Sequence, residues 1–299
     1  MGAAPRQGTG MTDIHQKTAV VTGASTGIGR AIAKTLIDKG WRVFGSVRKE
    51  EDAAALQDTL GENYVPLIFD VTDPDAVASA AAEVRDALDG RMLTGLVNNA
   101  GVALGGPLLH LDPEILRQQL EINIFGPLFV TQSFAPLLGA DRSLRGEPGR
   151  IVNMSSIAGK IASPILGPYA ISKHALEAFS ESLRRELLIY GIDVVIVGPG
   201  AVNTPIWGKA DDIDAEVYKG TDYYDILVNM REKYQAVGEA GLPPEDIGAL
   251  VAEILTTRKP KTRYAILRQK FLMWTVPRLL PKRTVDRILA KRFGIPVRS

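Results

Sequence analysis

The sequence predicts a doubly wound α/β fold, in which one parallel sheet is covered by helices on both faces. Short apolar runs alternate with helical patterns over residues 17–204. Right-handed crossovers between such runs give parallel strands that are buried on both faces. A Gly-rich turn follows the first run, where folds of this class bind ligands. The fold class and a ligand site at one sheet edge are therefore expected together.

Seven strands are predicted from apolar, β-branched runs. The first ends at glycines, and the sixth is fully apolar after its first residue. Runs of this length and composition are typical of strands buried in a parallel sheet. The predicted strands are residues 18–22, 42–47, 65–69, 93–98, 150–155, 193–197 and 263–267.

Helical patterns separate these strands. Gly40 ends the first helix, and the third has Asp73 as its expected N-cap with Pro74 at the first helical position. The longest pattern predicts one continuous helix. The predicted helices are residues 28–39, 50–60, 74–88, 113–138, 169–190 and 243–256.

The domain organisation follows from where this alternation begins and ends. We expect one domain over residues 17–267, with a flexible, Gly-rich leader at 1–16 and a basic extension at 268–299. Residues 204–242 are polar, aromatic and irregular, which is typical of a lid or binding loop. The leader has no apolar core of the kind that a secretory signal needs.

Composition excludes several classes of site. Hydrophobic residues make up 45% and charged residues 23% of the chain, the balance of an ordinary globular protein. Cysteine is absent, so a disulfide framework, a thiolate nucleophile and a Cys-ligated metal are excluded. The three histidines are scattered, and no metal site is expected.

Charge is distributed unevenly along the chain. Residues 258–299 contain thirteen Lys or Arg and one acid, Asp286, which leaves a net charge of −11 on residues 1–257. Val285, Ile288, Leu289 and Phe293 lie near helical spacing among the basic residues. A basic amphipathic helix can rest on anionic lipid, or it can cover the substrate cleft or a subunit interface.

The same segment bears on location and partners. Its longest apolar run is about ten residues, and a membrane span needs about 20. We expect a cytoplasmic protein, either free or peripheral to a membrane through this segment. Nucleic acid is not an expected partner, because no recognised nucleic-acid-binding element accompanies the charge.

The Gly-rich turn carries the first functional signal. Residues 22–29 read Thr-Gly-Ala-Ser-Thr-Gly-Ile-Gly between the first strand and the first helix. Glycines let the backbone approach a pyrophosphate, which the helix N-terminus then binds. The spacing TGxxxGxG resembles the short-chain dehydrogenase/reductase family, which implies a Rossmann fold. The expected cofactor-binding residues here are Gly23, Ser25, Thr26, Gly27, Ile28 and Gly29.

The end of the second predicted strand indicates which dinucleotide is bound. An acidic residue there would hold the ribose 2′-hydroxyl of NAD(H), but the sequence has Arg48. A guanidinium can pair with a 2′-phosphate in a bidentate manner. NADP(H) is therefore preferred, with NAD(H) as the alternative.

Further segments match the family pattern. The resemblance implies that Asp70, with Val71, contacts the adenine, and that the Asn-Asn-Ala-Gly segment shapes the cofactor site. It also implies that a PGxVxT segment after the sixth strand cradles the nicotinamide. The residues concerned are Asp70, Val71, Asn98, Ala100, Gly101, Pro199, Gly200, Val202 and Thr204.

The strongest functional signal is Ser156 followed by Tyr169-x-x-x-Lys173. Tyr169 and Lys173 share a helix face, and Ser156 follows the fifth strand, at the sheet edge that also carries the Gly-rich turn. A free tyrosine has a pKa of about 10, and a nearby ammonium favours the tyrosinate. Tyr169 is thus expected to be the general acid or base, with Ser156 stabilising charge on the substrate oxygen.

The resemblance assigns two further roles. It implies that Lys173, which with Tyr169 also belongs to the expected cofactor-binding residues, binds the nicotinamide ribose hydroxyls. It further implies that Asn123 positions a water that relays protons to that lysine. Ser155 is the neighbouring alternative to Ser156, but strand alternation directs the two side chains to opposite faces. The expected catalytic residues are Asn123, Ser156, Tyr169 and Lys173.

The substrate is expected to be lipophilic. Lys160, Lys209 and Lys219 are the nearest basic residues that could hold an anionic group. The residues expected to wall the site are mostly apolar: Val102, Leu104, Leu108, Ile161, Ile165, Leu166, Ile206 and Trp207. The segment 155–169 is similar to hydroxysteroid and retinol dehydrogenases, which implies a steroid- or retinoid-like alcohol or carbonyl.

We therefore expect an NADP(H)-dependent oxidoreductase. A carbonyl reductase of small xenobiotic ketones, a non-catalytic NADP(H)-binding regulator, and a lyase or epimerase remain alternatives. The resemblance implies a homodimer or homotetramer formed through the helices at 113–138 and 169–190.

Overall fold

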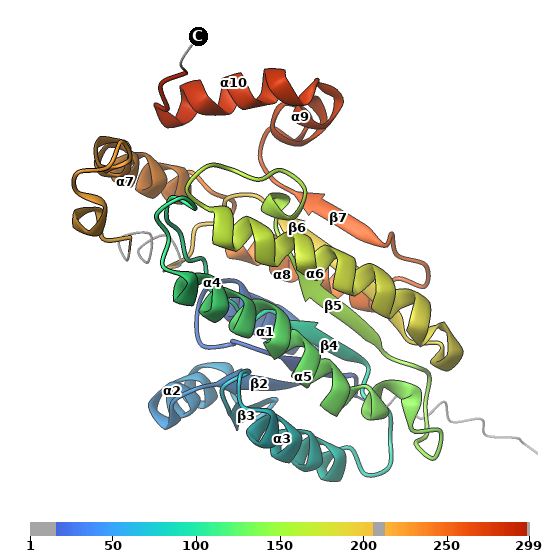
Figure 1. Cartoon of the computed structure of the whole chain (residues 1–299). Coiled ribbons are helices and arrows are strands. Elements are labelled where there is room, and N and C mark those ends of the chain that lie inside the picture. Colours follow the sequence, from blue (N-terminus) through green and yellow to red (C-terminus); the bar gives the residue numbers. More distant parts are fainter. Residues whose placement is uncertain (1–15, 206–212, 298–299) are drawn as a thin grey trace, which may run out of the picture.

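The computed structural model describes residues 16–205 and 213–297, and it confirms the predicted doubly wound fold (Figure 1). One sheet has the strand order β3-β2-β1-β4-β5-β6-β7, and every neighbouring pair is parallel. The strands are β1 Thr18–Val21, β2 Arg42–Val47, β3 Tyr64–Ile68, β4 Gly95–Asn98, β5 Arg150–Met154, β6 Asp193–Pro199 and β7 Arg263–Ile266.

Helices cover both faces of this sheet (Figure 1). On one face α1 and α8 pack together beside α2, and on the other α3, α5 and α6 lie over the strands. The helices are α1 Gly27–Asp38, α2 Glu50–Leu60, α3 Pro74–Ala87, α4 Pro113–Leu120, α5 Gly126–Phe134, α6 Gly167–Glu186, α7 Tyr224–Glu239, α8 Pro244–Thr256, α9 Val276–Leu279 and α10 Lys282–Phe293.

The core is two apolar layers, one on each side of the sheet. Along β1, Ala19 and Val21 point into one layer and Val20 into the other, and all three are fully buried. Successive side chains of a strand alternate between faces, so a strand that is buried on both must be apolar throughout. This explains why the predicted strands read as continuous apolar runs.

The single helix predicted over residues 113–138 is wrong in detail. The structure has α4, a π-helical turn at Glu121–Phe125, α5, and a second π-helical turn at Pro136–Ala140. Pro127, in the first turn of α5, and Pro136, at the start of the second π-helical turn, have no N–H to donate to the carbonyl four residues earlier. Each therefore removes one bond of the regular α-helical pattern next to a π-helical turn. The first of these turns contains Asn123.

The predicted irregular region 204–242 contains more helix than the sequence indicated. A 3₁₀ turn at Ala215–Tyr218 precedes α7, and residues 206–212 lie outside the described part of the chain. Ile226, Leu227 and Met230 of α7 pack with Ile165 and Tyr218 in a third, smaller core. This apolar cluster stabilises α7 through tertiary contacts, which its weak sequence pattern did not reveal.

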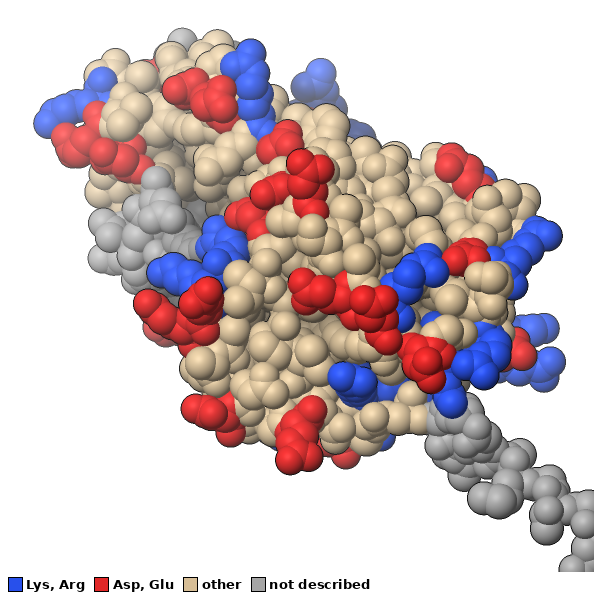
Figure 2. Space-filling view, turned by 90° about the horizontal axis from the view of Figure 1, so that it is seen from below, with Lys and Arg blue, Asp and Glu red and all other residues tan. Residues whose placement is uncertain are grey.

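The chain after β7 continues through a π-helical turn at Phe271–Thr275, then α9 and α10. Phe293 and Ile295 at its end pack against the third core, so this segment lies beside α7 (Figure 1). The opposite side of the molecule, seen in Figure 2, carries intermixed acidic and basic side chains. Over the described residues, no helix combines the length and apolarity that crossing a membrane requires.

Candidate active site

Three predicted catalytic side chains come together at the carboxyl edge of the sheet. Ser156 directly follows β5, Tyr169 lies in the first turn of α6, and Lys173 lies one turn further along that helix. Ser156 hydrogen-bonds with the Tyr169 phenol. The Lys173 ammonium lies 5.7 Å from the centre of the Tyr169 ring and donates to the carbonyl of Met154 at 2.8 Å.

Burial dominates the acid–base properties of this group. It raises the pKa of Tyr169, and the hydrogen bond with Ser156 offsets part of that rise. It lowers the pKa of Lys173 to about 8, against the attraction of the Glu177 carboxylate. The direction for Tyr169 is opposite to the lowering expected from the sequence, because desolvation of the tyrosinate outweighs the effect of its neighbours.

Asn123 is held tightly next to this group. Its Oδ1 accepts from the Val102 N–H at 3.0 Å, and its Nδ2 donates to the Val102 carbonyl and the Ser172 hydroxyl, each at 3.0 Å. Gly101 lies between Asn123 and Lys173, and a Cβ there would lie 3.1 Å from Asn123 Oδ1 and 3.8 Å from Lys173 Nζ. The polar side-chain atoms of Asn123 are therefore used to position the loop after β4.

Ser155 and Ser156 have separate partners, as strand alternation predicts. The Ser155 hydroxyl donates to Glu177 Oε1 at 2.8 Å, whereas Ser156 Oγ accepts from the Ala158 N–H at 3.1 Å. Sequence reasoning missed Glu177, which is 1% exposed and sits one helical turn after Lys173. The sequence did contain a signal for Glu177, because an acidic residue on the buried face of an amphipathic helix needs a partner.

The Gly-rich turn has the geometry of a phosphate cradle. Gly23 and Gly27 adopt positive φ values of 65° and 54°. A Cβ on Gly23 would lie 2.9 Å from Ala100 Cα, and one on Gly29 would collide with the Gly23 carbonyl. No side chain caps the first N–H groups of α1, and no acid lies in its first turn. Residues Ser25, Thr26 and Ile28 complete this backbone surface, which fits a dinucleotide pyrophosphate.

Arg48 and Asp70 lie together at the ends of neighbouring strands. Arg48 follows β2 with a side chain that is 70% exposed, and its Nη1 lies 4.0 Å from Asp70 Oδ2. The other oxygen of Asp70 accepts from the N–H and hydroxyl of Thr72, at 3.0 and 2.8 Å. Asp70 does not cap α3, because Asp73 does so. An exposed guanidinium beside the Gly-rich turn is suited to a ribose phosphate.

The other predicted cofactor residues line the same edge. The Ala100 N–H donates to Thr22 Oγ1 at 3.0 Å, and the Asn98 amide donates to Asn153 at 2.9 Å and Thr131 at 3.2 Å. Gly200 donates its N–H to Ile266 at 2.8 Å. The remaining members on this edge are Val71, after β3, and Pro199, Val202 and Thr204, at and after the end of β6. Thr204 faces Gly27 across the turn.

Two of the lysines named as possible anion-binding groups, Lys160 and Lys219, are described by the structure, and both form ion pairs. Lys160 lies 3.4 Å from Glu177 and 3.8 Å from Glu181, and Lys219 lies 3.1 Å from Glu216. Lys209, with Ile206 and Trp207, falls outside the described residues. The described basic candidates are therefore neutralised by acids of the same chain.

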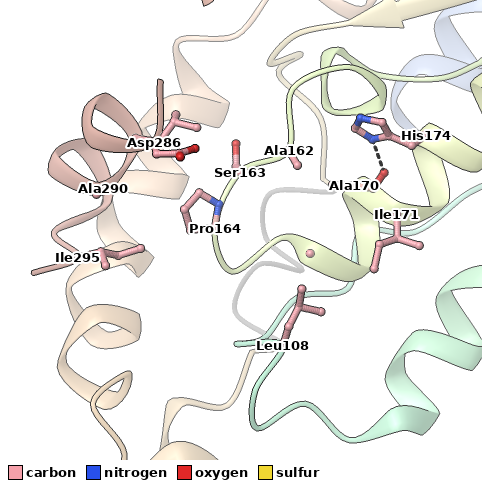
Figure 3. A pocket seen from close by; sticks show the side chains of 12 residues that line it. Leu108, Ala162, Ser163, Pro164, Ala170, Ile171, His174, Asp286, Ala290 and Ile295 are labelled. Atoms are coloured by element: carbon pink, nitrogen blue, oxygen red, sulfur yellow. Dashed lines mark hydrogen bonds between the residues drawn. The ribbon is translucent and has the colours of Figure 1, made fainter. Parts of the chain in front are cut away.

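A surface cavity of about 680 Å³ lies between the start of α6 and α10. Figure 3 shows Leu108, Pro164, Ile171 and Ile295 around it, with His174 bonded to the Ala170 carbonyl. Its lining is mostly apolar, and it includes none of Ser156, Tyr169 and Lys173. It is therefore separate from the catalytic group, on the outer side of α6.

The fold and this arrangement define an oxidoreductase of the short-chain dehydrogenase class. The family described as short chain dehydrogenase matches residues 17–214, so the chain belongs to that family. The resemblance inferred from the sequence is thereby confirmed.

Particular relatives are similar over nearly the whole chain. An NADPH-dependent 3-dehydrocapnine reductase of Ornithobacterium rhinotracheale is 42% identical, over 91% of this chain and 96% of its own length. Human retinol dehydrogenase 5 is 32% identical, over 90% of this chain and 86% of its own. A short-chain dehydrogenase/reductase from Burkholderia phymatum, solved in complex with NAD, is 26% identical and covers 97% of this chain and 100% of its own, with a TM-score of 0.75.

Proposed function

We propose that this protein is an NADP(H)-dependent oxidoreductase that interconverts an alcohol and its ketone or aldehyde on a lipophilic substrate. The observation that carries the proposal is the convergence of Ser156, Tyr169 and Lys173 at the sheet edge that also bears the phosphate cradle. The exposed Arg48 supports NADP(H) over NAD(H), and the 42% identical relative is described as NADPH-dependent.

The proposed mechanism assigns one task to each side chain. When bound, NADPH supplies the hydride. Tyr169 donates its phenolic proton to the carbonyl oxygen during reduction and accepts it back during oxidation. Ser156 donates a hydrogen bond to the same oxygen and stabilises its developing charge. The Lys173 ammonium stabilises the tyrosinate and reaches the ribose hydroxyls, while Asn123 supports the proton relay to it.

The proposal of a lipophilic substrate rests on the apolar residues expected to line the substrate site and on the activities of similar proteins. The residues proposed as walls are apolar where the structure describes them: Val102, Leu104, Leu108, Ile161, Ile165 and Leu166. Of these, Leu108 lines the cavity outside α6 and Ile165 packs in the third core. Relatives are named for activity on 3-dehydrocapnine and on retinol. We propose a lipophilic carbonyl compound, with 3-dehydrocapnine, all-trans-retinaldehyde and a 3-ketosteroid as the first compounds to assay.

Tyr169→Phe tests the chemistry. We expect NADPH oxidation with at least one of these compounds, and a loss of about 100-fold or more in kcat in the variant, because the general acid is removed. Tyr190→Phe is the control. Tyr190 ends the 3₁₀ turn that directly follows α6, and this variant should keep full activity. Tight NADPH binding without turnover of any compound would instead favour a non-catalytic regulator.

We also propose a homo-oligomer and a peripheral lipid contact. Phe125 and Ile171, which lie on the segments of the predicted subunit interface, are 44% and 41% exposed. Light scattering of the purified protein measures the oligomer, and a monomeric mass would refute it. The lipid contact would be made by the basic C-terminal segment of an otherwise cytoplasmic protein.

A further inference from the structure

A buried ion pair between Glu177 and Arg263 lies next to the catalytic group of Ser156, Tyr169 and Lys173. Arg263 of β7 donates from Nε to Glu177 Oε2 at 2.9 Å and from Nη2 to Oε1 at 2.9 Å, so the guanidinium grips the carboxylate in a bidentate manner. Glu177 is 1% exposed, and the Arg263 side chain is 17% exposed. Bidentate pairs of this kind fix geometry as well as charge.

Both members of the pair also hold the segment that carries Ser156. Glu177 accepts from the Ser155 hydroxyl at 2.8 Å, and Arg263 Nη2 donates to the Ser156 carbonyl at 3.3 Å. The loop that begins at Ser155 and Ser156 is thus held at two successive residues. Ser155 is bound to Glu177 of α6, and Ser156 is bound to Arg263 of β7. Displacing this loop would move the Ser156 hydroxyl relative to the Tyr169 phenol.

Two glycines make room for the pair. A Cβ on Gly198 would lie 2.5 Å from Arg263 Nη2, and a Cβ on Gly159 would lie 2.8 Å from Ser155 Oγ and 2.9 Å from Glu177 Cγ. Both glycines have φ outside the positive range that favours glycine, so their backbone conformation does not explain them. The space that the ion pair needs explains why both positions are glycine.

The outer end of the network lies in the C-terminal segment. The Arg263 guanidinium stacks 4.3 Å from the centre of the Trp274 ring, and Arg278 lies 4.7 Å from the same ring. Trp274 is buried. Cation–π contacts of a desolvated guanidinium restrict its orientation, so the segment after β7 helps to hold Arg263 toward Glu177.

We propose that Glu177 and Arg263 are positioning residues that hold Ser156 and Lys173 in catalytic geometry and connect them through Trp274 to the C-terminal segment. The inference rests on the roles proposed above for Ser156, Tyr169 and Lys173. Glu177 acts on Lys173 from the same helix face, one turn away, and its negative charge favours the ammonium. Two charged groups surround the Glu177 carboxylate, Arg263 and Lys160. The titratable groups that face Lys173 are Tyr169 and Glu177.

Glu177→Gln tests the proposal, because it keeps the size of the side chain and removes its charge. We expect kcat for NADPH-dependent reduction of all-trans-retinaldehyde or 3-dehydrocapnine to fall about 10-fold to 100-fold, with little change in the KM for NADPH. Glu181→Gln, which changes a half-exposed acid one turn further along α6, is the matched control. It should behave like the unmodified protein.

A second readout needs no substrate. With NADP⁺ bound, the ultraviolet absorbance of tyrosinate, taken as the difference from Tyr169→Phe, reports the titration of Tyr169. In Glu177→Gln this titration should shift, because the carboxylate charge that acts on Lys173 beside Tyr169 is removed. A purely structural pair would leave it in place.

Two further variants keep the test decisive. If Glu177→Gln does not fold, Arg263→Lys decides, since it keeps the charge and loses the fork. The double variant Glu177→Gln with Arg263→Met should recover thermal stability without recovering kcat. Kinetics and a Tyr169 titration equal to those of Glu181→Gln would overturn the proposal. Full activity in Tyr169→Phe would instead refute the proposed chemistry itself.

Discussion

At the scale of single residues, the charge of Lys173 is the most pH-sensitive feature of the site. Its ammonium is buried, and burial brings its pKa down to about 8. The lysine is therefore charged below about pH 8 and neutral above it. The tyrosinate that it is proposed to stabilise would lose that support within a pH range where the protein can be assayed.

We expect kcat/KM for alcohol oxidation to stop rising with pH above about 8. The tyrosinate fraction of Tyr169 grows with pH, because the pKa of this group is raised, but the Lys173 ammonium that stabilises it is lost above about pH 8. Initial rates across buffers of constant ionic strength measure this. Lys173→Arg keeps its charge throughout, so any activity that it retains should go on rising. A wild-type profile that rises without a break well above pH 8 would contradict the expectation.

Arg48 is the residue on which cofactor preference depends. Arg48→Ala should reduce the ratio of kcat/KM for NADPH to that for NADH about 10-fold, the lower end for a charge-assisted hydrogen bond, because the side chain is exposed. The neighbouring Lys49→Ala is the control. Equal losses with both cofactors would refute a contact between Arg48 and the 2′-phosphate.

At the scale of elements, the beginning of α3 is the clearest case of a helix that local sequence defines. Asp73 accepts from the N–H groups of Asp75 and Ala76 at 3.1 and 3.0 Å, and Pro74 occupies the first helical position. These bonds satisfy two of the N–H groups that a helix otherwise leaves free. The predicted cap is confirmed.

Asp73→Ala should lower the free energy of unfolding by about 1 kcal/mol, because the two capping bonds are lost. Urea denaturation followed by circular dichroism measures the change. Asp73→Asn, whose side-chain oxygen can still accept, should stay near the unmodified protein. If Asn were as destabilising as Ala, the carboxylate charge rather than the cap would be responsible.

The helices that the sequence described least well are those shaped by neighbours. The interruption between α4 and α5 was marked by Pro127, yet the apolar pattern runs through it without a break. In α7 the buried residues contact Ile165 and Tyr218, which lie outside the helix. Periodicity within one segment carries little information about such partners.

At the scale of the whole molecule, the basic C-terminal segment is an outlier in charge and in exposure. Phe271 and Leu279 are 73% and 78% exposed among lysines and arginines. The side of the molecule seen in Figure 2 instead mixes both signs of charge. Exposed apolar groups within a cationic segment are suited to an anionic bilayer surface.

We expect the protein to sediment with phosphatidylglycerol vesicles but not with phosphatidylcholine vesicles, and to be released by high salt, which screens the attraction. Phe271→Ser combined with Leu279→Ser should weaken binding. Leu188→Ser combined with Ile189→Ser, which removes equally exposed side chains beyond α6, should not. Failure of the unmodified protein to bind anionic vesicles would refute the lipid contact.

The sequence by itself determined the order of strands and helices through β6 and the residues expected at the cofactor and catalytic positions. Strands buried on both faces must be apolar throughout, and turns that admit phosphate require glycine, so both leave local patterns. The spacing of Ser156, Tyr169 and Lys173 is likewise a property of one strand end and one helix face.

Only the tertiary structure decided what surrounds these residues. Glu177 and Arg263 are 86 positions apart in the chain and become a buried pair only when α6 and β7 come together. The pKa of Tyr169 follows from the solvent that folding removes, which no local pattern records. The burial of polar side chains and long-range charge pairing depend on the complete packed molecule, and for that reason they were absent from the prediction.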